Sequence, residues 1–219
     1  GVYTDSSVEM TGGIIGGENE INKNTAQCGG GVYITCENDL LTEKSRDITF
    51  TMTNASIRNN QAQKGGGVYI DGYYSKGSST ALFTMKQNSS ITENKAVYGS
   101  EQIESDGNGG GVYISASCSA DNRGIPYEEE RKYASYFNME YGEICNNTAQ
   151  NNGGGIYTKD NDTFCEHING YGIEWEDIMV YIKNGKISNN TSENDGGGIY
   201  TKGHTVGTTF FTECGEISN

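Results

Sequence analysis

Long apolar runs are absent from this sequence, and no charged-then-apolar stretch begins it. The first absence excludes a membrane-spanning helix, and the second predicts that any export signal lies outside this segment or has been removed. Basic residues are scarce, because 15 lysines and arginines stand against 29 acids, for a net charge of -14. Such a surface repels nucleic acid and anionic membranes, so we expect neither as a partner and no membrane insertion by this segment.

Histidine and paired-cysteine motifs are equally scarce. The two histidines, His167 and His204, are isolated in the sequence, and no CxxC pair occurs. A zinc site or a Ser-His-Asp triad therefore has little support, and we expect no metal centre. Proline occurs once, and glycine plus proline make up about 15% of the chain, below the level that is typical of disorder.

Helical patterning is also missing, and a short repeat takes its place. The stretch 125–137, IPYEEERKYASYF, lacks a long apolar stripe at three-four spacing, so helix-based solenoids are excluded. A glycine triplet followed by Val-Tyr or Ile-Tyr recurs instead, with motif tyrosines 30 to 44 residues apart. A strand-like Val-Tyr-Ile follows the glycines, which excludes a phosphate-binding loop because that loop needs a helix and a Lys-Ser/Thr pair.

A second phrase alternates with the first and predicts the fold. It reads FTMTNASIRNNQA from Phe50, FTMKQNSSITENKA from Phe83 and FNMEYGEICNNTA from Phe137. Strict alternation around Phe-x-Met and Val-Tyr-Ile indicates two short strands per repeat, each with one apolar face. Repeated strands with a period of 20 to 50 residues predict a right-handed parallel β-helix of five to six coils; a left-handed helix stays open, although it usually has shorter repeats.

The whole of 1–219 is expected to be one β-helical repeat domain, a segment of a longer rod. The number of residues between a motif tyrosine and the next phenylalanine varies, which predicts variable loops on one corner of the coil. Asparagines that follow an isoleucine by three residues are expected both to adopt the left-handed conformation of a tight bend and to form a hydrogen-bonded ladder, and the glycines to form the tight corners. The ladder asparagines are Asn24, Asn60, Asn94, Asn147 and Asn190, and the turn glycines are Gly29, Gly65, Gly109, Gly153 and Gly196.

The alternation of the glycine phrase with the Phe-x-x-Asn-like phrase resembles the repeats of polymorphic outer membrane proteins. It is also similar to the repeats of related bacterial autotransporters and adhesins. The passenger regions of that group are right-handed parallel β-helices, related to the pectin-lyase-like superfamily. The resemblance covers the whole chain and implies an exported surface protein that acts in attachment.

The motif tyrosines alternate with core positions and are predicted to form a surface ladder. They are Tyr33, Tyr69, Tyr113, Tyr157 and Tyr200. Cross-coil stacking makes a structural ladder the simplest interpretation. A contiguous aromatic strip on the surface would equally suit a carbohydrate platform or a face that packs on a neighbouring rod.

The cysteines fit an oxidising compartment, and several asparagines are candidate acceptors if the source glycosylates exported proteins. Six cysteines are candidate disulfide partners, with Cys28–Cys36 and Cys118–Cys165 as possible pairs and reduced core thiols as the alternative. The six are Cys28, Cys36, Cys118, Cys145, Cys165 and Cys214. The candidate N-glycosylation sites are Asn54, Asn88, Asn146, Asn161 and Asn189. Asn190 also lies in a sequon, but its place in the ladder should protect it.

We therefore predict a non-enzymatic structural or adhesive rod at the cell surface, without a cofactor. Its expected partners are a surface glycan, a protein receptor or copies of itself end to end in a fibre. The alternative is a polysaccharide lyase or glycosidase. Its candidate acids lie in loops, and weak Ca²⁺ binding by such acids stays open. These residues are Glu128, Glu129 and Glu130 with Arg131, Asp160 with Asp162, and Glu174 with Asp177.

Overall fold

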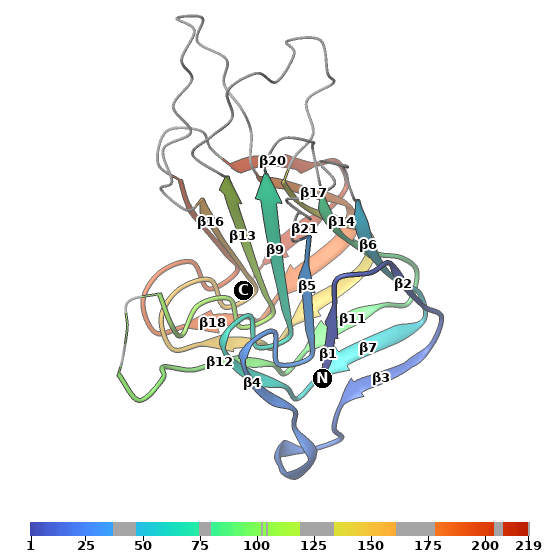
Figure 1. The fold of residues 1–219 in the computed structure, drawn as a ribbon. Coiled ribbons are helices and arrows are strands. Elements are labelled where there is room, and N and C mark those ends of the chain that lie inside the picture. Colours follow the sequence, from blue (N-terminus) through green and yellow to red (C-terminus); the bar gives the residue numbers. More distant parts are fainter. Residues whose placement is uncertain are drawn as a thin grey trace, which may run out of the picture.

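The computed structural model describes residues 1–36, 47–74, 80–101, 103, 105–118, 134–160, 178–203 and 208–218. Throughout these residues every strand pair is parallel, and three sheets wrap around one apolar interior (Figure 1). The chain forms the right-handed parallel β-helix that the repeat predicts, with the hand that nearly all parallel crossovers adopt. No helix of the described residues has the length and apolar character to cross a membrane.

The first sheet contains the Val-Tyr-Ile strands and marks the six coils. In the described part of the chain its order follows the sequence, and Figure 1 shows these strands side by side. They are β1 (Val2–Thr4), β5 (Val32–Thr35), β9 (Val68–Tyr74), β13 (Val112–Cys118), β16 (Ile156–Asp160) and β19 (Ile199–Lys202).

The second sheet is the largest and has a bend along its middle. The strands before the bend are β2 (Val8–Met10), β6 (Ile48–Met52), β10 (Ala81–Met85) and β20 (Thr208–Thr212). The strands after it are β3 (Gly13–Gly16), β7 (Ala55–Arg58), β11 (Ser90–Thr92) and β21 (Glu216–Ser218). In coils four and five single long strands span the bend, namely β14 (Ser135–Cys145) and β17 (Ile178–Ser188).

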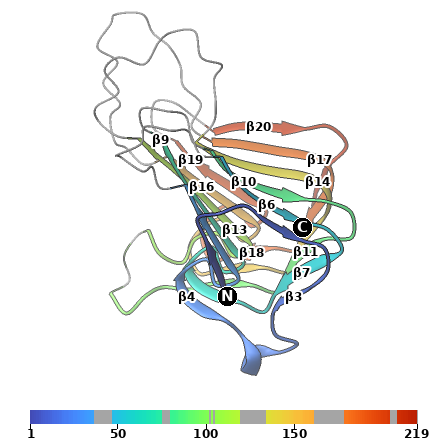
Figure 2. The ribbon, with the colours of Figure 1, turned by 45° about the vertical axis from the view of Figure 1, so that its right-hand side comes forward.

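The third sheet is short and closes each of the first five coils (Figure 2). Its strands are β4 (Thr25–Cys28), β8 (Gln61–Lys64), β12 (Lys95–Ala96), β15 (Thr148–Ala149) and β18 (Thr191–Ser192). This sheet corrects the prediction of two strands per repeat. Strands of two to four residues are too short to show an alternating pattern, so the sequence does not reveal them.

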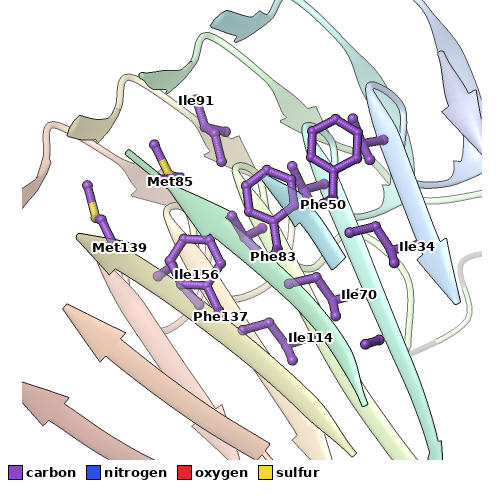
Figure 3. Close-up of a cluster of buried hydrophobic side chains, with 14 of the residues drawn as sticks. Ile34, Phe50, Ile70, Phe83, Met85, Ile91, Ile114, Phe137, Met139 and Ile156 are labelled. Atoms are coloured by element: carbon purple, nitrogen blue, oxygen red, sulfur yellow. The ribbon is translucent and has the colours of Figure 1, made fainter. Parts of the chain in front are cut away.

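At each inward-facing position, successive coils place similar side chains on top of one another (Figure 3). Phe50 and Phe83 have ring centroids 5.2 Å apart at an interplanar angle of 2°, and Phe137 continues the stack at 5.9 Å. Met52, Met85 and Met139 lie in register beside them, fully buried. The inward positions predicted from Phe-x-Met and Val-x-Ile alternation are therefore confirmed.

The first coil differs from the spacing that the sequence indicated. The structure pairs Ile15, not Ile21, with Ile57 of the next coil. Ile21 lies in the 3-10 turn η1 (Glu20–Asn22) and is 88% exposed. An inserted turn after Gly17 therefore separates the core isoleucine from Asn24, and a fixed three-residue spacing cannot describe it.

The longest described excursion from the coil follows β12. Val97 still donates a backbone hydrogen bond to Ala62 of the preceding coil, and the chain rejoins the stack at Gly107, which donates to Gln63. The irregular spacing between Phe83 and Val112 therefore reflects an insertion at the corner before the first sheet. The more variable insertions all lie at another corner, between a strand of the first sheet and the next strand of the second.

Candidate functional site

The predicted asparagine ladder lies inside the coil, at the corner between the second and third sheets. From Asn24 to Asn147, each side-chain Nδ2 donates to the Oδ1 of the asparagine in the next coil, over 2.8 to 3.0 Å. The same Nδ2 of Asn94 also donates to the backbone oxygen of Ile57, and its Oδ1 accepts from the backbone nitrogen of Asn60. The buried amides, those of Asn60, Asn94, Asn147 and Asn190, thus hold successive coils together and are closed to a ligand.

The residue before the ladder asparagine makes the corner turn in the last four members of the ladder, and sequence reasoning missed it; before Asn24, Lys23 is extended, with φ of -69°. Asn59, Glu93, Asn146 and Asn189 have φ between 52° and 58°, in the left-handed region. Asparagine tolerates that conformation, whereas glutamate is uncommon there. The repeated Asn-Asn pair was the available signal, because the first asparagine turns the chain and the second enters the ladder.

Each glycine of the triplet has its own physical reason, shown by the triplet of the fourth coil. Gly109 has φ of +70°, which favours glycine. A Cβ added to Gly110 would lie 2.5 Å from the backbone oxygen of Gly154, and one added to Gly111 would lie 2.6 Å from that of Gly155. The triplet therefore makes a turn and allows close coil-to-coil contact, which accounts for its recurrence. The five predicted turn glycines all have φ between 59° and 70°.

The tyrosine ladder forms, but the prediction of a surface ladder is wrong for its centre. Ring centroids of successive motif tyrosines are 4.8 to 5.4 Å apart. Tyr69, Tyr113 and Tyr157 are 8%, 2% and 3% exposed, while Tyr33 and Tyr200 are half-buried. Each central ring lies between two neighbours, so the stack covers its own faces and offers no aromatic platform to a glycan or to a second rod.

Polar side chains on the outer face of the first sheet form hydrogen bonds with hydroxyl groups of the tyrosine ladder. The Tyr33 hydroxyl donates to Asp71 Oδ2 over 3.1 Å, and the Ser115 hydroxyl donates to Asp71 Oδ1 over 2.6 Å. The Tyr69 and Ser115 hydroxyls share a 3.0 Å hydrogen bond. Burial, reinforced by the negative charge of Asp71, raises the pKa of Tyr69 and Tyr33 well above 10. These phenols therefore stay neutral and serve the framework.

The described cysteines are free thiols, so the predicted Cys28–Cys36 pair is wrong. The side chain of Cys28 packs on the outer tyrosine ladder, whereas that of Cys36 packs in the interior core. The two sulfurs thus lie on opposite faces of the first sheet. Burial raises the pKa of Cys36 to about 11, which keeps it a protonated core thiol. Cys145 and Cys214 are free as well, the side chain of Cys118 and all of Cys165 lie outside the described residues, and no pairing is assigned to them.

The described sequon asparagines lie at turns of the second sheet: Asn54 and Asn88 at its bend, and Asn146, Asn189 and Asn190 at the corner where it ends. Asn54, Asn88, Asn146 and Asn189 are exposed and have positive φ, whereas Asn190 is 1% exposed in the ladder. The Nδ2 of Asn88 donates to Asn54 Oδ1 over 2.9 Å. Asn161 lies outside the described residues. Geometry thus separates accessible sequons from the protected one, and glycosylation stays a prediction.

Among the candidate catalytic acids, Asp160 is the one within the described residues. It ends β16 and is 8% exposed. Glu128, Glu129, Glu130, Arg131, Asp162, Glu174 and Asp177 lie outside the described residues, as do His167 and His204. Within the described part, no group of three or more His, Cys, Asp or Glu side chains is placed to hold a metal ion.

A shallow polar groove opens on the outer face of the second sheet, at its bend. Its volume is about 560 Å³, within the range of small-ligand sites. Sequence reasoning did not single it out. The groove is lined by Gln87, Asn88, Ser89, Ser90, Tyr141, Gly142, Glu143 and Lys186, from coils three, four and five.

One extra residue in the third coil shapes this groove. Four residues, 86–89, stand between Met85 and Ser90, whereas three, 53–55, stand between their partners Met52 and Ser56. The surplus lies among 86–88, because Ser89 and Ala55 hold the same register position and are both buried. The Ser89 hydroxyl donates to the backbone oxygen of Met52 over 3.0 Å. Bulges of this kind are common beside functional sites. The signal was the extra letter in FTMKQNSSIT compared with FTMTNASIR.

Gly142 brings the fourth coil against the bulge. Its φ is 103°, and a Cβ added there would lie 2.3 Å from the backbone oxygen of Ser89. That oxygen accepts a hydrogen bond from the backbone nitrogen of Glu143 over 3.0 Å. The close approach holds Tyr141 and Glu143 at the groove, and Tyr141 remains 42% exposed. The third and fourth coils thus form most of one preformed surface depression, to which the fifth coil adds Lys186.

Comparison with known families gives one finding. A model described as the Chlamydia polymorphic membrane protein repeat matches residues 143–159 and 184–202. No curated protein and no solved structure matches the chain. The two matched stretches each run from the bend of the second sheet, through an asparagine of the ladder and a glycine triplet, to a motif tyrosine. Over these two stretches the chain is similar to the repeats of a family of chlamydial surface membrane proteins.

Proposed function

We propose that this chain is part of a non-enzymatic rod at the cell surface that acts in attachment. The observation that carries the proposal is where the family matches fall, because they coincide with the coil framework of ladder asparagine, glycine corner and stacked tyrosine. A surface family that uses this framework displays a rigid body with variable segments on it. The pectin-lyase-like relationship stays a prediction.

The distribution of chemistry on the coil supports a passive role for the framework. The recurrent polar groups are engaged in coil-to-coil hydrogen bonds, so variation is left to the outer face of the second sheet and to the inserted segments. A rigid scaffold that carries variable segments is the usual arrangement of a recognition protein.

Attachment is tested with beads. Latex beads coated with the purified chain should adhere to epithelial cells more than beads coated with an unrelated acidic protein of similar size. Antibodies against the chain should label intact, unpermeabilised source cells. Absence of both adhesion and surface labelling would contradict the proposal.

The lyase or glycosidase alternative has its own readout. The purified chain, incubated with neutral and acidic polysaccharides with and without Ca²⁺, should release no new reducing ends and no unsaturated sugars. Steady product release that scales with protein concentration would replace the attachment rod by an enzyme.

End-to-end assembly is a second proposal about partners. Parallel coils can continue across two chains by strand addition. Electron microscopy of the native extracellular protein should then show long particles with a regular axial repeat. A population of short, discrete rods would contradict assembly into a fibre and leave attachment unaffected.

A further inference from the structure

We propose that the groove at the bend of the second sheet binds a neutral saccharide unit of a glycan. The inference deepens the proposed attachment function and rests on it for its biological meaning. Its physical basis is the combination of an exposed tyrosine, two carboxamides, a hydroxyl and one pair of opposite charges around a preformed depression.

The lining matches the two kinds of surface that a pyranose ring offers. A sugar ring has a C–H face, which an aromatic ring with a negative π face attracts, and a rim of hydroxyl groups. Tyr141 supplies an exposed aromatic ring. Gln87 is exposed, and within the described part of the chain its amide makes no hydrogen bond, so it can both donate and accept. Glu143 can accept hydrogen bonds from two adjacent hydroxyls.

The groove has no excess of either charge. Glu143 and Lys186 are its charged residues, and Lys186 also pairs with Glu216 over 3.2 Å on the surface. Such an exposed pair is weak, so Lys186 can donate to a hydroxyl instead. The chain as a whole carries a net charge of -14, which disfavours sulfated or carboxylated glycans. These two facts select a neutral sugar.

Two other ligand classes fit less well. A peptide that adds a strand needs an unpaired sheet edge, but the groove lies over paired strands, with Ser90, Glu143 and Lys186 in one cross-strand row. An apolar small molecule needs a mostly apolar enclosed pocket, whereas seven of the eight lining residues here are polar or glycine. The remaining residue, Tyr141, is amphipathic.

The experiment measures polysaccharide binding by affinity gel electrophoresis. The probes are four neutral polymers (galactomannan, xyloglucan, mixed-linkage β-glucan and soluble chitin oligomers) and two anionic polymers (heparin and polygalacturonate). At least one neutral polymer should retard the wild-type chain, and the anionic polymers should not. Absence of retardation by every neutral polymer, or retardation by the anionic polymers alone, would overturn the proposal.

Variants locate the site. Tyr141→Ala should weaken binding about fivefold or more, because tyrosine is enriched among the contact residues whose truncation costs more than about 1 kcal/mol. Tyr141→Phe keeps the ring and should retain most of the binding, and Gln87→Ala should weaken it. Phe211→Ala is the matched control, because Phe211 is a 53% exposed aromatic residue on β20 outside the groove. Equal binding by Tyr141→Ala and wild type would overturn the assignment.

Folding and attachment are measured on the same variants. Tyr141 is exposed, so its truncation should leave circular dichroism and thermal unfolding unchanged within about 0.5 kcal/mol. If beads adhere to cells while no neutral polysaccharide is bound, the saccharide site fails and the attachment function stands. If a neutral polymer is bound through Tyr141 while beads never adhere, the attachment function fails and the site stands.

Discussion

At the scale of single residues, two adjacent positions at the corner after the second sheet turn the chain and connect each coil to the next. The first adopts the left-handed conformation at the surface, and the second sends a buried amide along the axis. The sequence predicted the second role, because an asparagine column in stacked coils has an evident hydrogen-bonding logic. It placed the left-handed turn on the same asparagine, which is wrong, because the residue before it makes the turn. Exposed asparagines are common in turns of every kind, so the sequence does not show which of two neighbours turns.

Glu93 occupies this left-handed position where three other coils have asparagine. Its φ is 58°, and the side chain is exposed. A left-handed residue with an ordinary Cβ costs about 1 to 2 kcal/mol, which asparagine partly avoids. Glu93→Asn should therefore raise the free energy of unfolding by up to about 1 kcal/mol in urea titrations. Glu143→Asn, the same change on a strand, should give no gain; equal effects of the two would argue against backbone strain.

Removal of a ladder amide should have the opposite effect. Asn94 is fully buried, donates to Ile57 and Asn147, and accepts twice from Asn60. Asn94→Ala leaves these buried groups without partners, at about 1 to 3 kcal/mol for each. We expect a loss of at least about 3 kcal/mol in the free energy of unfolding. Thr92→Ala, two residues away, should change it by about 0.5 kcal/mol or less.

At the scale of elements, the two long ladders were predicted correctly as columns, and one was assigned the wrong environment. Alternation along Val-Tyr-Ile places the tyrosine opposite the core, and the structure agrees with that. The alternation of side chains along a strand does not tell what covers the outer face of the sheet. Here the tyrosine rings of successive coils cover one another and exclude water from their faces. Burial of a repeated outward residue depends on its neighbours above and below, which a single strand pattern does not report.

The buried phenols predict a pH dependence. Burial raises the pKa of Tyr113 well above its usual 10, so the folded chain keeps a proton that the unfolded chain loses at high pH. Stability is therefore full below pH 10 and falls as the pH rises above it, by at most about 1.4 kcal/mol per pH unit for each such group. Unfolding in urea from pH 8 to 11 should show this fall.

Tyr113→Phe isolates one phenol of the ladder. The ring, its stacking and its burial remain, so stability near pH 8 should differ little from wild type. Above pH 10 the variant should lose stability less steeply, because it has no phenol proton to release. Identical slopes for the two proteins would show that Tyr113 is not ionised on unfolding.

At the scale of the whole molecule, the parallel β-helix, its coil number and its variable corner followed from the repeat. The third sheet and the groove did not follow from it. Both depend on the number of residues that each coil has between positions paired with the neighbouring coil. The groove arises from a one-residue mismatch between coils three and four. The extra residue can be located, and the groove inferred from it, only when the register of the strands is known.

The charge of the whole rod predicts a salt effect. A net charge of -14 destabilises a compact state by self-repulsion, whereas the described ion pairs, such as Lys183–Glu213 at 4.0 Å, are exposed and weak. Raising NaCl from about 0.01 to 0.1 M shortens the Debye length from about 30 to 10 Å. The melting temperature should therefore rise by a few degrees in calorimetry. A fall would indicate that surface ion pairs outweigh the repulsion.

The asparagine ladder also gives the rod a direction. Every described carboxamide from Asn24 to Asn147 points its N–H toward the following coil, so the amide dipoles add along the axis and polarise one another. The ladder is therefore a polarised chain of hydrogen bonds that runs along the axis of the coil. A break at its centre interrupts mutual polarisation on both sides, so the amide of Asn94 should be worth more than that of Asn24, although both are the same residue in the same column.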